Sequence, residues 1–355
     1  MNRHRALSRV VLLTGLAAAA VAVMLAAGCG GSGSPPKDVV LVTHDSFAVS
    51  KGVEQAFEKD TGLELRILQG GDANETLNKA LLTAGDPQGD VIFGIDDSIL
   101  SRALDGDLLD EYRSPELSAL EPDFSSPDSH VTPIDHGEVC LNVDRGWFES
   151  HDVPPPASLA DLALDRYRNL LVVENPATSS PGLAFLLATI ATFGDRWETY
   201  WRGLRANGVM VVDGWEEAYT QQFSGAAGSP GKRPIVVSYA SSPAAEVIFA
   251  SKKPSTAPTA AVEDGCYRQV EYAGILRGAH NVDGARKLID FMLSDRFQAD
   301  VPGSMFVYPV RSGVPLPGAF ETYAVVPKDP LQLPPEEIDA NRDRWVARWT
   351  DIVVR

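Results

Sequence analysis

Residues 172–182 (V-V-E-N-P-A-T-S-S-P-G) bring hydroxyl groups and free backbone amides to one point of the chain. A short apolar run of strand type precedes this turn, and residues 183–193 form an apolar helical pattern after it. Ser179 or Ser180 is a natural N-cap, and Pro181 suits the first helical position because its missing amide would be unpaired there. Such a helix start can bind an oxygen-bearing or anionic group, or it can be a plain cap.

Other predicted turns carry polar or aromatic side chains of the same kind. They are Asp45, Asp72, Asp135, Trp215, Tyr239, Ser241 and Ser242. Aromatic faces beside carboxylates suit a flat, positively charged ring, through cation–π attraction of about 0.5 to 2 kcal/mol each. The hydroxyls suit the polar or phosphorylated end of the same molecule. The alternative is that Trp215 is a core residue and the Ser-Pro turns are ordinary caps.

The repeated order of elements near the start of the folded region predicts an α/β sheet. Strands are expected at 39–43, 63–68 and 90–95, each followed by a polar turn and a helix. In parallel sheets of this kind, ligands bind outside the carboxyl ends of the strands. His44, Asp45 and Asp72 fall at those ends, so they are candidate binding residues.

The pattern changes near residue 131, where the chain is expected to cross into a second lobe. About 315 residues are too many for one hydrophobic core. We therefore expect one lobe from 38–135 and 275–306, and another from 138–272 and 310–355. Cys140 and Cys266 are expected to form a disulfide between strands of the second lobe, with two buried free thiols as the alternative.

The first thirty residues have the pattern of a secretory signal. Arg3, Arg5 and Arg9 precede an apolar run, 10–27, and Leu-Ala-Ala-Gly comes directly before Cys29. This ending is similar to the lipobox of bacterial lipoproteins, although Ala26 stands where Leu is usual. We expect a signal peptide at 1–28, lipidation of Cys29 and a flexible tether at 29–37, with a retained membrane anchor as the alternative. The folded part is then extracytoplasmic and contacts the membrane only through its lipid.

The acidic composition argues against a nucleic-acid partner. The formal net charge is -17, and it becomes about -20 once the three arginines of the signal are removed. Such a field repels nucleic acid and anionic lipid.

The usual enzyme motifs are missing from the sequence. It contains no G-x-S-x-G, no H-E-x-x-H and no P-loop. His44-Asp45 and Asp135-His136 could approach each other as a metal or acid/base cluster, but neither pair has the spacing of ligands by itself. We therefore expect no catalysis, no cofactor and no metal.

Eight segments, spread from about Val39 to Trp349, closely match a known family in order and spacing. They are T-H-D-S-F (43–47), G-I-D (94–96), P-I-D-H-G (133–137), N-P-A-T-S-S-P-G-L (175–183), G-W-E-E-A-Y (214–219), S-Y-A-S-S-P-A (238–244), Y-R-Q-V-E (267–271) and Y-P-V (308–310). Through them the chain resembles the thiamine-binding proteins, the extracytoplasmic receptors of thiamine ABC transporters.

The resemblance implies a type II periplasmic-binding-protein fold with two lobes, mostly parallel sheets flanked by helices, and a hinge of crossover strands. It implies a monomer that closes on thiamine, its monophosphate or its diphosphate and docks on an ABC permease. The family's ligand positions map onto Asp72, Ala73, Ser179, Ser180, Trp215, Tyr239, Ala240, Ser241 and Ser242. Three positions depart from the family: His44 replaces Tyr, Phe306 replaces Trp, and Ala245 replaces Tyr. His44 or Phe306 would complete the ring stack, and Asp45, Asp72 or Asp135 would offset the ligand's charge.

Two other functions fit parts of the same pattern. The fold also serves receptors for polyamines and ferric ion, although the Tyr-Tyr pair usual in ferric receptors is missing. A lipid-anchored hydrolase using His44 or His136 with a serine is the alternative from another class.

Overall fold

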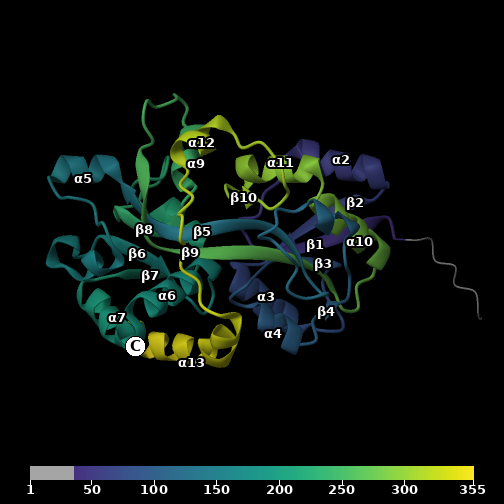
Figure 1. Ribbon diagram of the computed structural model, residues 1–355, viewed down its shortest axis with the longest axis horizontal. Helices are drawn as coiled ribbons and strands as arrows, with labels where there is room; N and C mark the ends of the chain where they lie inside the picture. The colour runs from purple at the N-terminus through teal and green to yellow at the C-terminus, as the bar shows by residue number, and fades with distance from the viewer. Residues whose placement is uncertain (1–35) are drawn as a thin grey trace, which may run out of the picture. The chain divides into compact units, whose positions relative to one another are not determined.

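Two long antiparallel strands, β5 (Thr132–Asp144) and β9 (Thr259–Leu276), run through the middle of a ten-stranded sheet. The computed structural model describes residues 36–355, so the predicted signal, Cys29 and nearly all of the tether lie outside the described residues. Along the sheet the strands follow the order β2-β1-β3-β9-β5-β8-β6-β7, while β10 (Tyr308–Pro309) pairs with β5 and β4 (Leu109–Asp110) with β9. Figure 1 shows β9 extending between the strands of both ends.

One end of the sheet is parallel, as the strand-turn-helix repeats predict. Its strands are β1 (Asp38–Thr43), β2 (Glu64–Gln69) and β3 (Val91–Asp96). Its first three helices are α2 (Lys51–Thr61), α3 (Ala73–Leu82) and α4 (Leu100–Asp105). The buried, apolar faces of β1 and β3 form a core with α10 (Val282–Met292) and α11 (Asp295–Ser304), which return to this end late in the chain.

The other end is also parallel and is built by the middle of the chain. Its strands are β6 (Leu171–Glu174), β7 (Met210–Val212) and β8 (Ile235–Tyr239). Its helices are α5 (Arg145–His151), α6 (Ser180–Phe193), α7 (Trp197–Ala206), α8 (Trp215–Glu217) and α9 (Ser242–Phe249). The C-terminal helix α13 (Pro335–Val353) packs on α7, where the buried rings of Trp201 and Trp349 lie 5.4 Å apart.

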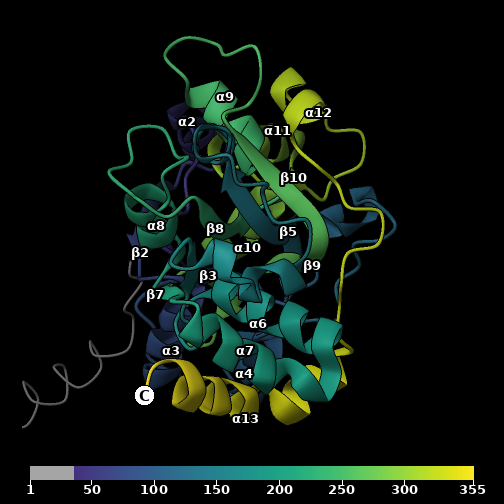
Figure 2. The ribbon, with the colours of Figure 1, turned by 90° about the vertical axis from the view of Figure 1, so that its left-hand side faces the viewer.

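Helices cover both faces of the sheet. In both views α3, α4, α6, α7 and α13 lie on one side of the strands, and α2, α9, α11 and α12 (Gly318–Tyr323) lie on the other (Figures 1 and 2). The chain also forms short helical segments at Pro115–Ala119, Leu159–Ala163, Asp165–Tyr167, Gly194–Arg196 and Ala218–Gln222. No helix among residues 36–355 is long and apolar enough to cross a membrane.

Strands β5 and β9 are the only connections in the sheet between its two parallel ends, within the described part of the chain. At one end β3 pairs antiparallel with β9, and at the other β8 pairs antiparallel with β5. Since β5 and β9 also run antiparallel to each other, the sheet is mixed. The predicted disulfide between Cys140 on β5 and Cys266 on β9 is confirmed. The assignment of residues to two lobes stays a prediction, and β5 and β9 are where a hinge between them would lie.

Candidate functional site

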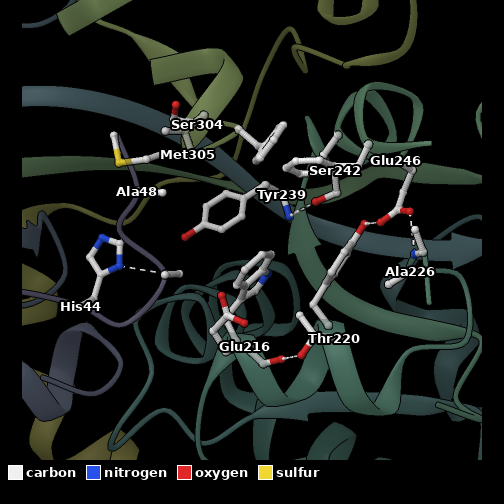
Figure 3. A pocket seen from close by; sticks show the side chains of 18 of the residues that line it. His44, Ala48, Glu216, Thr220, Ala226, Tyr239, Ser242, Glu246, Ser304 and Met305 are labelled. Carbon is white, nitrogen blue, oxygen red and sulfur yellow. Dashed lines mark hydrogen bonds between the residues drawn. The ribbon is translucent and has the colours of Figure 1, made fainter. Parts of the chain in front are cut away.

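A cavity of about 370 Å³ lies at the carboxyl ends of β1 and β8, where the sequence predicted the binding residues. Its volume is within the range of about 300 to 1,000 Å³ that small-molecule sites occupy. One part of its wall comes from the turn after β1 and the segment after α11: His44, Ser46, Ala48, Ser304, Met305, Phe306 and Val307. Another comes from α8, α9 and the turns beside them: Trp215, Glu216, Tyr219, Thr220, Ala226, Ala227, Ser242, Ala245, Glu246 and Phe249. Tyr239 projects between these parts (Figure 3).

Trp215 and its aromatic neighbours form an aromatic wall of the cavity. The Trp215 and Tyr219 rings stack with centroids 5.1 Å apart and planes 16° apart, and Tyr239 lies 6.3 Å from Trp215. The indole N–H of Trp215 donates to Ser238 Oγ at 2.9 Å, which fixes the direction of the ring. Because the indole N–H is already bonded, the ring offers the cavity a π face rather than a polar group.

Tyr239 reaches the cavity from the last position of β8. Gly137 on β5 leaves room for the ring, because a Cβ at this position would come within 2.7 Å of it. The Tyr239 hydroxyl donates to Gln269 Oε1 at 3.3 Å, and the Tyr239 amide donates to Ser242 Oγ at 3.3 Å. Tyr239 is therefore held at its backbone amide and at its hydroxyl.

Phe306 has a left-handed backbone, with φ of 59°. This conformation is unfavourable for a bulky side chain and persists only where tertiary contacts enforce it. Here the Ser241 hydroxyl donates to the Phe306 carbonyl, and the Phe306 ring packs against Phe249 at 4.8 Å. Ser241 is fully buried and outside the cavity wall, so its observed contact positions the Phe306 ring.

His44 is an uncharged part of the wall at neutral pH. Burial lowers its pKa to about 4. Its Nδ1 bonds to Ser46 Oγ at 2.8 Å, and its Nε2 lies 3.6 Å from a carboxylate oxygen of Glu271. A neutral imidazole adds no positive charge that would repel a cation.

The charges that line the cavity are of one sign. Its carboxyl groups are Glu216, Glu246 and Glu271, and no lysine or arginine is among the described residues that line it. Glu246 accepts from the Tyr219 hydroxyl and from the Ala227 amide, both at 2.8 Å. Aromatic faces with carboxyl groups and no competing cation give a site that favours a flat cation.

At the start of α6, beside Ser179 and Ser180, backbone amides already donate to side chains of the protein. Ser179 is the N-cap of α6, as predicted, and its Oγ accepts from the Gly182 amide. The Asp72 carboxylate accepts from the backbone amides of Ala73, Ser180 and Trp215 at 2.6, 3.0 and 3.0 Å. Asp72 therefore joins the starts of α3, α6 and α8 through one buried carboxylate.

Removing that carboxylate is expected to loosen the base of the site. In Asp72→Ala, the Ser180 and Trp215 amides lose their acceptor, at a cost of about 2 kcal/mol in the free energy of unfolding. Urea denaturation checks this, with the exposed Asp105→Ala as the matched control on the following helix. Equal unfolding free energies for the two variants would contradict it.

The structure brings some predicted ligand residues to the cavity and places the others around it. His44, Trp215, Tyr239, Ser242 and Phe306 line it. Outside its lining lie Asp45, Asp72, Ala73, Asp135, Ser179, Ser180, Ala240 and Ser241. Ser180 is nevertheless close to Trp215, because their amides bond to the same carboxylate. Whether each of these residues contacts a ligand stays a prediction.

Among the cavity-lining residues that were not predicted from the sequence are Tyr219, Glu246, Phe249 and Glu271. Tyr219 lies one helical turn after Trp215, a signal that could have found it. Glu271 is on a strand, and only the pairing of β9 with its neighbours shows where its carboxyl points.

His136, a candidate for a metal or acid/base cluster, lies apart from this cavity. Its ring stacks between Phe124 at 4.5 Å and Tyr308 at 5.3 Å, and its Nδ1 is 3.4 Å from Glu138. Among residues 36–355, no group of three or more His, Cys, Asp or Glu side chains is arranged to hold a metal ion.

Comparison with known proteins gives consistent matches. Residues 86–335 match the family described as bacterial extracellular solute-binding protein. The thiamine-binding periplasmic protein of Salmonella typhimurium is 30% identical over 89% of this chain and 94% of its own length, and that of Escherichia coli gives the same figures. A solved structure, a periplasmic thiamin binding protein, has a TM-score of 0.81 and 28% identity and covers 92% of this chain and 98% of its own.

Proposed function

Because this chain belongs to the bacterial extracellular solute-binding protein family, we propose that it captures thiamine outside the cytoplasm and delivers it to an ABC importer. The observation that carries the proposal is the cavity, which combines Trp215 and Tyr239 with carboxyl groups and lacks lysine and arginine in its described lining. Thiamine joins a flat pyrimidine ring to a flat, permanently charged thiazolium ring, so this wall complements it. The two relatives that are 30% identical to this chain are named thiamine-binding proteins.

The mechanism is binding, with no bond made or broken. The rings of Trp215, Tyr239 and Phe306 enclose the two rings of the ligand, and the nearby carboxyl groups offset its charge. The lobes close by rotation about β5 and β9, and the ligand stabilises the closed form by its differential affinity for that form.

The departures from the family leave an aromatic wall in place. His44 keeps a flat ring beside Phe47 and Phe93, with centroids 6.4 and 5.6 Å away. Phe306 keeps an apolar ring where Trp is usual, and Ala245 opens the cavity wall where Tyr is usual. The smaller side chains leave more space in the site on the side of α9.

We place the protein outside the cytoplasmic membrane, anchored by a lipid on Cys29. The motif L-A-A-G-C and the short Gly/Ser/Pro tether support this placement. The receptor acts as a monomer, and its partner is the permease of the importer. Mass spectrometry of the mature N-terminus checks the anchor, because a diacylated cysteine has a mass that a free N-terminus lacks.

A panel of ligands tests the proposed specificity by thermal unfolding. Thiamine, its two phosphates, spermidine and ferric citrate are added to the mature protein. A ligand at 100 times its dissociation constant stabilises the native state by about 2.7 kcal/mol, so thiamine or one of its phosphates is expected to raise Tm. If spermidine or ferric citrate raises Tm and no thiamine compound does, the receptor serves another cation.

A further inference from the structure

Three carboxyl groups stand in register across three adjacent strands in the centre of the sheet. Asp96 on β3 pairs with Glu271 on β9, and Glu271 pairs with Asp135 on β5. Directly opposed residues of antiparallel strands point to the same face, with Cβ atoms about 5 Å apart. Like charges in such positions repel each other, so a row of three carboxylates requires a compensating charge or a proton.

The three members of this row, Asp96, Glu271 and Asp135, have different partners. Asp96 is fully buried but well bonded: it accepts from the Ser98 amide at 2.7 Å and from Gln269 Nε2 at 2.6 Å. Asp135 is also fully buried; among residues 36–355 its oxygens have no N–H or hydroxyl donor, and its side chain contacts the Glu271 carboxyl. Glu271 is 8% exposed and is the member that lines the cavity. The unsatisfied negative charge therefore lies on the side of Asp135 and Glu271.

Within the part of the chain that the structure describes, no cation compensates this pair. The ionisable groups that face Glu271 from the packed elements are His44, Asp72, Asp96, Asp135 and Tyr239. His44 is neutral near pH 7, because burial lowers its pKa to about 4. Burial raises the pKa of Asp135 to about 7. Burial, followed by the charge of Asp135, raises the pKa of Glu271 well above its usual value. Without a ligand, the pair keeps a proton at mildly acidic pH.

We propose that Glu271 is the residue that recognises the positive charge of the ligand, and that one proton leaves the Glu271–Asp135 pair for solvent when the cation enters. This inference rests on the proposed function and deepens it. The cation takes the place of the proton: it supplies the compensating positive charge, and Glu271 becomes a carboxylate facing it. Selectivity for a charged ring over a neutral one of equal shape then comes from this exchange.

The exchange gives binding a pH dependence of defined sign. Where the free pair is protonated and the bound pair is ionised, lowering the pH by one unit weakens cation binding up to tenfold. At higher pH, where the free pair is already ionised, the dissociation constant levels off. Binding therefore tightens as the pH rises from 5.5 through 7, and it levels off only above the pKa of the free pair.

Isothermal titration calorimetry of the mature protein at pH 6 measures the proton directly. Thiamine is titrated in two buffers of different ionisation enthalpy, and the difference in heat is expected to correspond to release of about one proton. The matched probe is an analogue in which a neutral thiophene replaces the thiazolium ring. It keeps the pyrimidine, so any proton from that ring is counted in both titrations, and the analogue itself is expected to release about one proton less.

Two variants of opposite expected effect identify the residue. Glu271→Gln is expected to abolish the release and the advantage of thiamine over its neutral analogue. Asp135→Asn removes the repelling carboxylate, which lowers the pKa of Glu271 although its burial remains. The proton release at pH 6 is therefore expected to fall, and the affinity at pH 5.5 to rise several-fold. Glu263→Gln, an exposed position on the same strand, is the control and is expected to keep the release of the wild type.

Each other outcome overturns a defined part of the proposal. Thiamine binding with no proton released overturns the exchange and leaves the receptor function standing. Release that persists in Glu271→Gln overturns the assignment to this residue. Should Glu271→Gln fail to fold, Asp135→Asn decides: unchanged release and unchanged affinity at pH 5.5 overturn the exchange. Absence of thiamine binding to the wild type overturns the receptor function as well.

Discussion

Replacing Trp215 with alanine is expected to weaken thiamine binding by about 3 kcal/mol, which is roughly 150-fold in the dissociation constant. The Trp215 ring lines the cavity, stacks on Tyr219 and is directed by its bond to Ser238. Its loss removes a π face from the cation and leaves space for water. Titration calorimetry or quenching of the remaining tryptophan fluorescence measures the change.

Two further variants separate the role of the Trp215 ring from general damage. Trp215→Phe keeps an aromatic face but loses the indole N–H, so its affinity is expected to lie between those of the wild type and Trp215→Ala. Trp147→Ala removes a tryptophan that stacks on His151 at 4.0 Å, outside the cavity lining, and should leave affinity within about twofold of the wild type. Equal losses in Trp215→Ala and Trp147→Ala would show that Trp215 does not hold the ligand.

Removing the disulfide is expected to lower the free energy of unfolding by about 5 kcal/mol. Cys140 and Cys266 are 126 residues apart in sequence, and a cross-link that closes a loop of this length strongly restricts the unfolded chain. Both cysteines are buried between β5 and β9. The variant is Cys140→Ala with Cys266→Ala, unfolded in guanidinium chloride under oxidising conditions.

The reduced wild type is the control for this measurement. In a reducing agent it is expected to approach the stability of the double variant, because both lack the cross-link. Matching transition midpoints for the oxidised wild type and the double variant would contradict the prediction. A thiamine affinity that falls together with stability would show that the bond also fixes β5 and β9 as they pass the site.

Much of the fold could be predicted from the sequence, because it depends on local signals. The strands at 39–43, 63–68 and 90–95 and the helix capped by Ser179 follow from apolar runs, turn residues and caps that lie within a few positions of each other. The disulfide was expected from the number and setting of the cysteines. The family motifs indicated the region of the site through His44, Trp215, Tyr239 and Phe306, which all line the cavity.

Two segments have conformations that local sequence patterns do not predict. In the segment 305–310, the strand is limited to Tyr308–Pro309, because Phe306 takes a left-handed backbone that a strand cannot contain. Leu159–Ala163 forms only a short helical turn, because the next residue, Leu164, has an extended backbone. In both cases the conformation depends on a contact distant in sequence or on a single backbone dihedral. The periodicity of apolar residues predicts neither of these.

The sequence by itself determined the elements, the acidic charge and the residue types from which a cation site could be made. Only the tertiary structure decided which of them meet. Asp72, predicted to face a ligand, bonds to three amides of three different segments, and Glu271, overlooked in the sequence, lies between Asp96 and Asp135 and reaches the cavity. The physical reason is strand register: residues 96, 135 and 271 become neighbours only when β3, β9 and β5 pair, and no local propensity encodes that pairing.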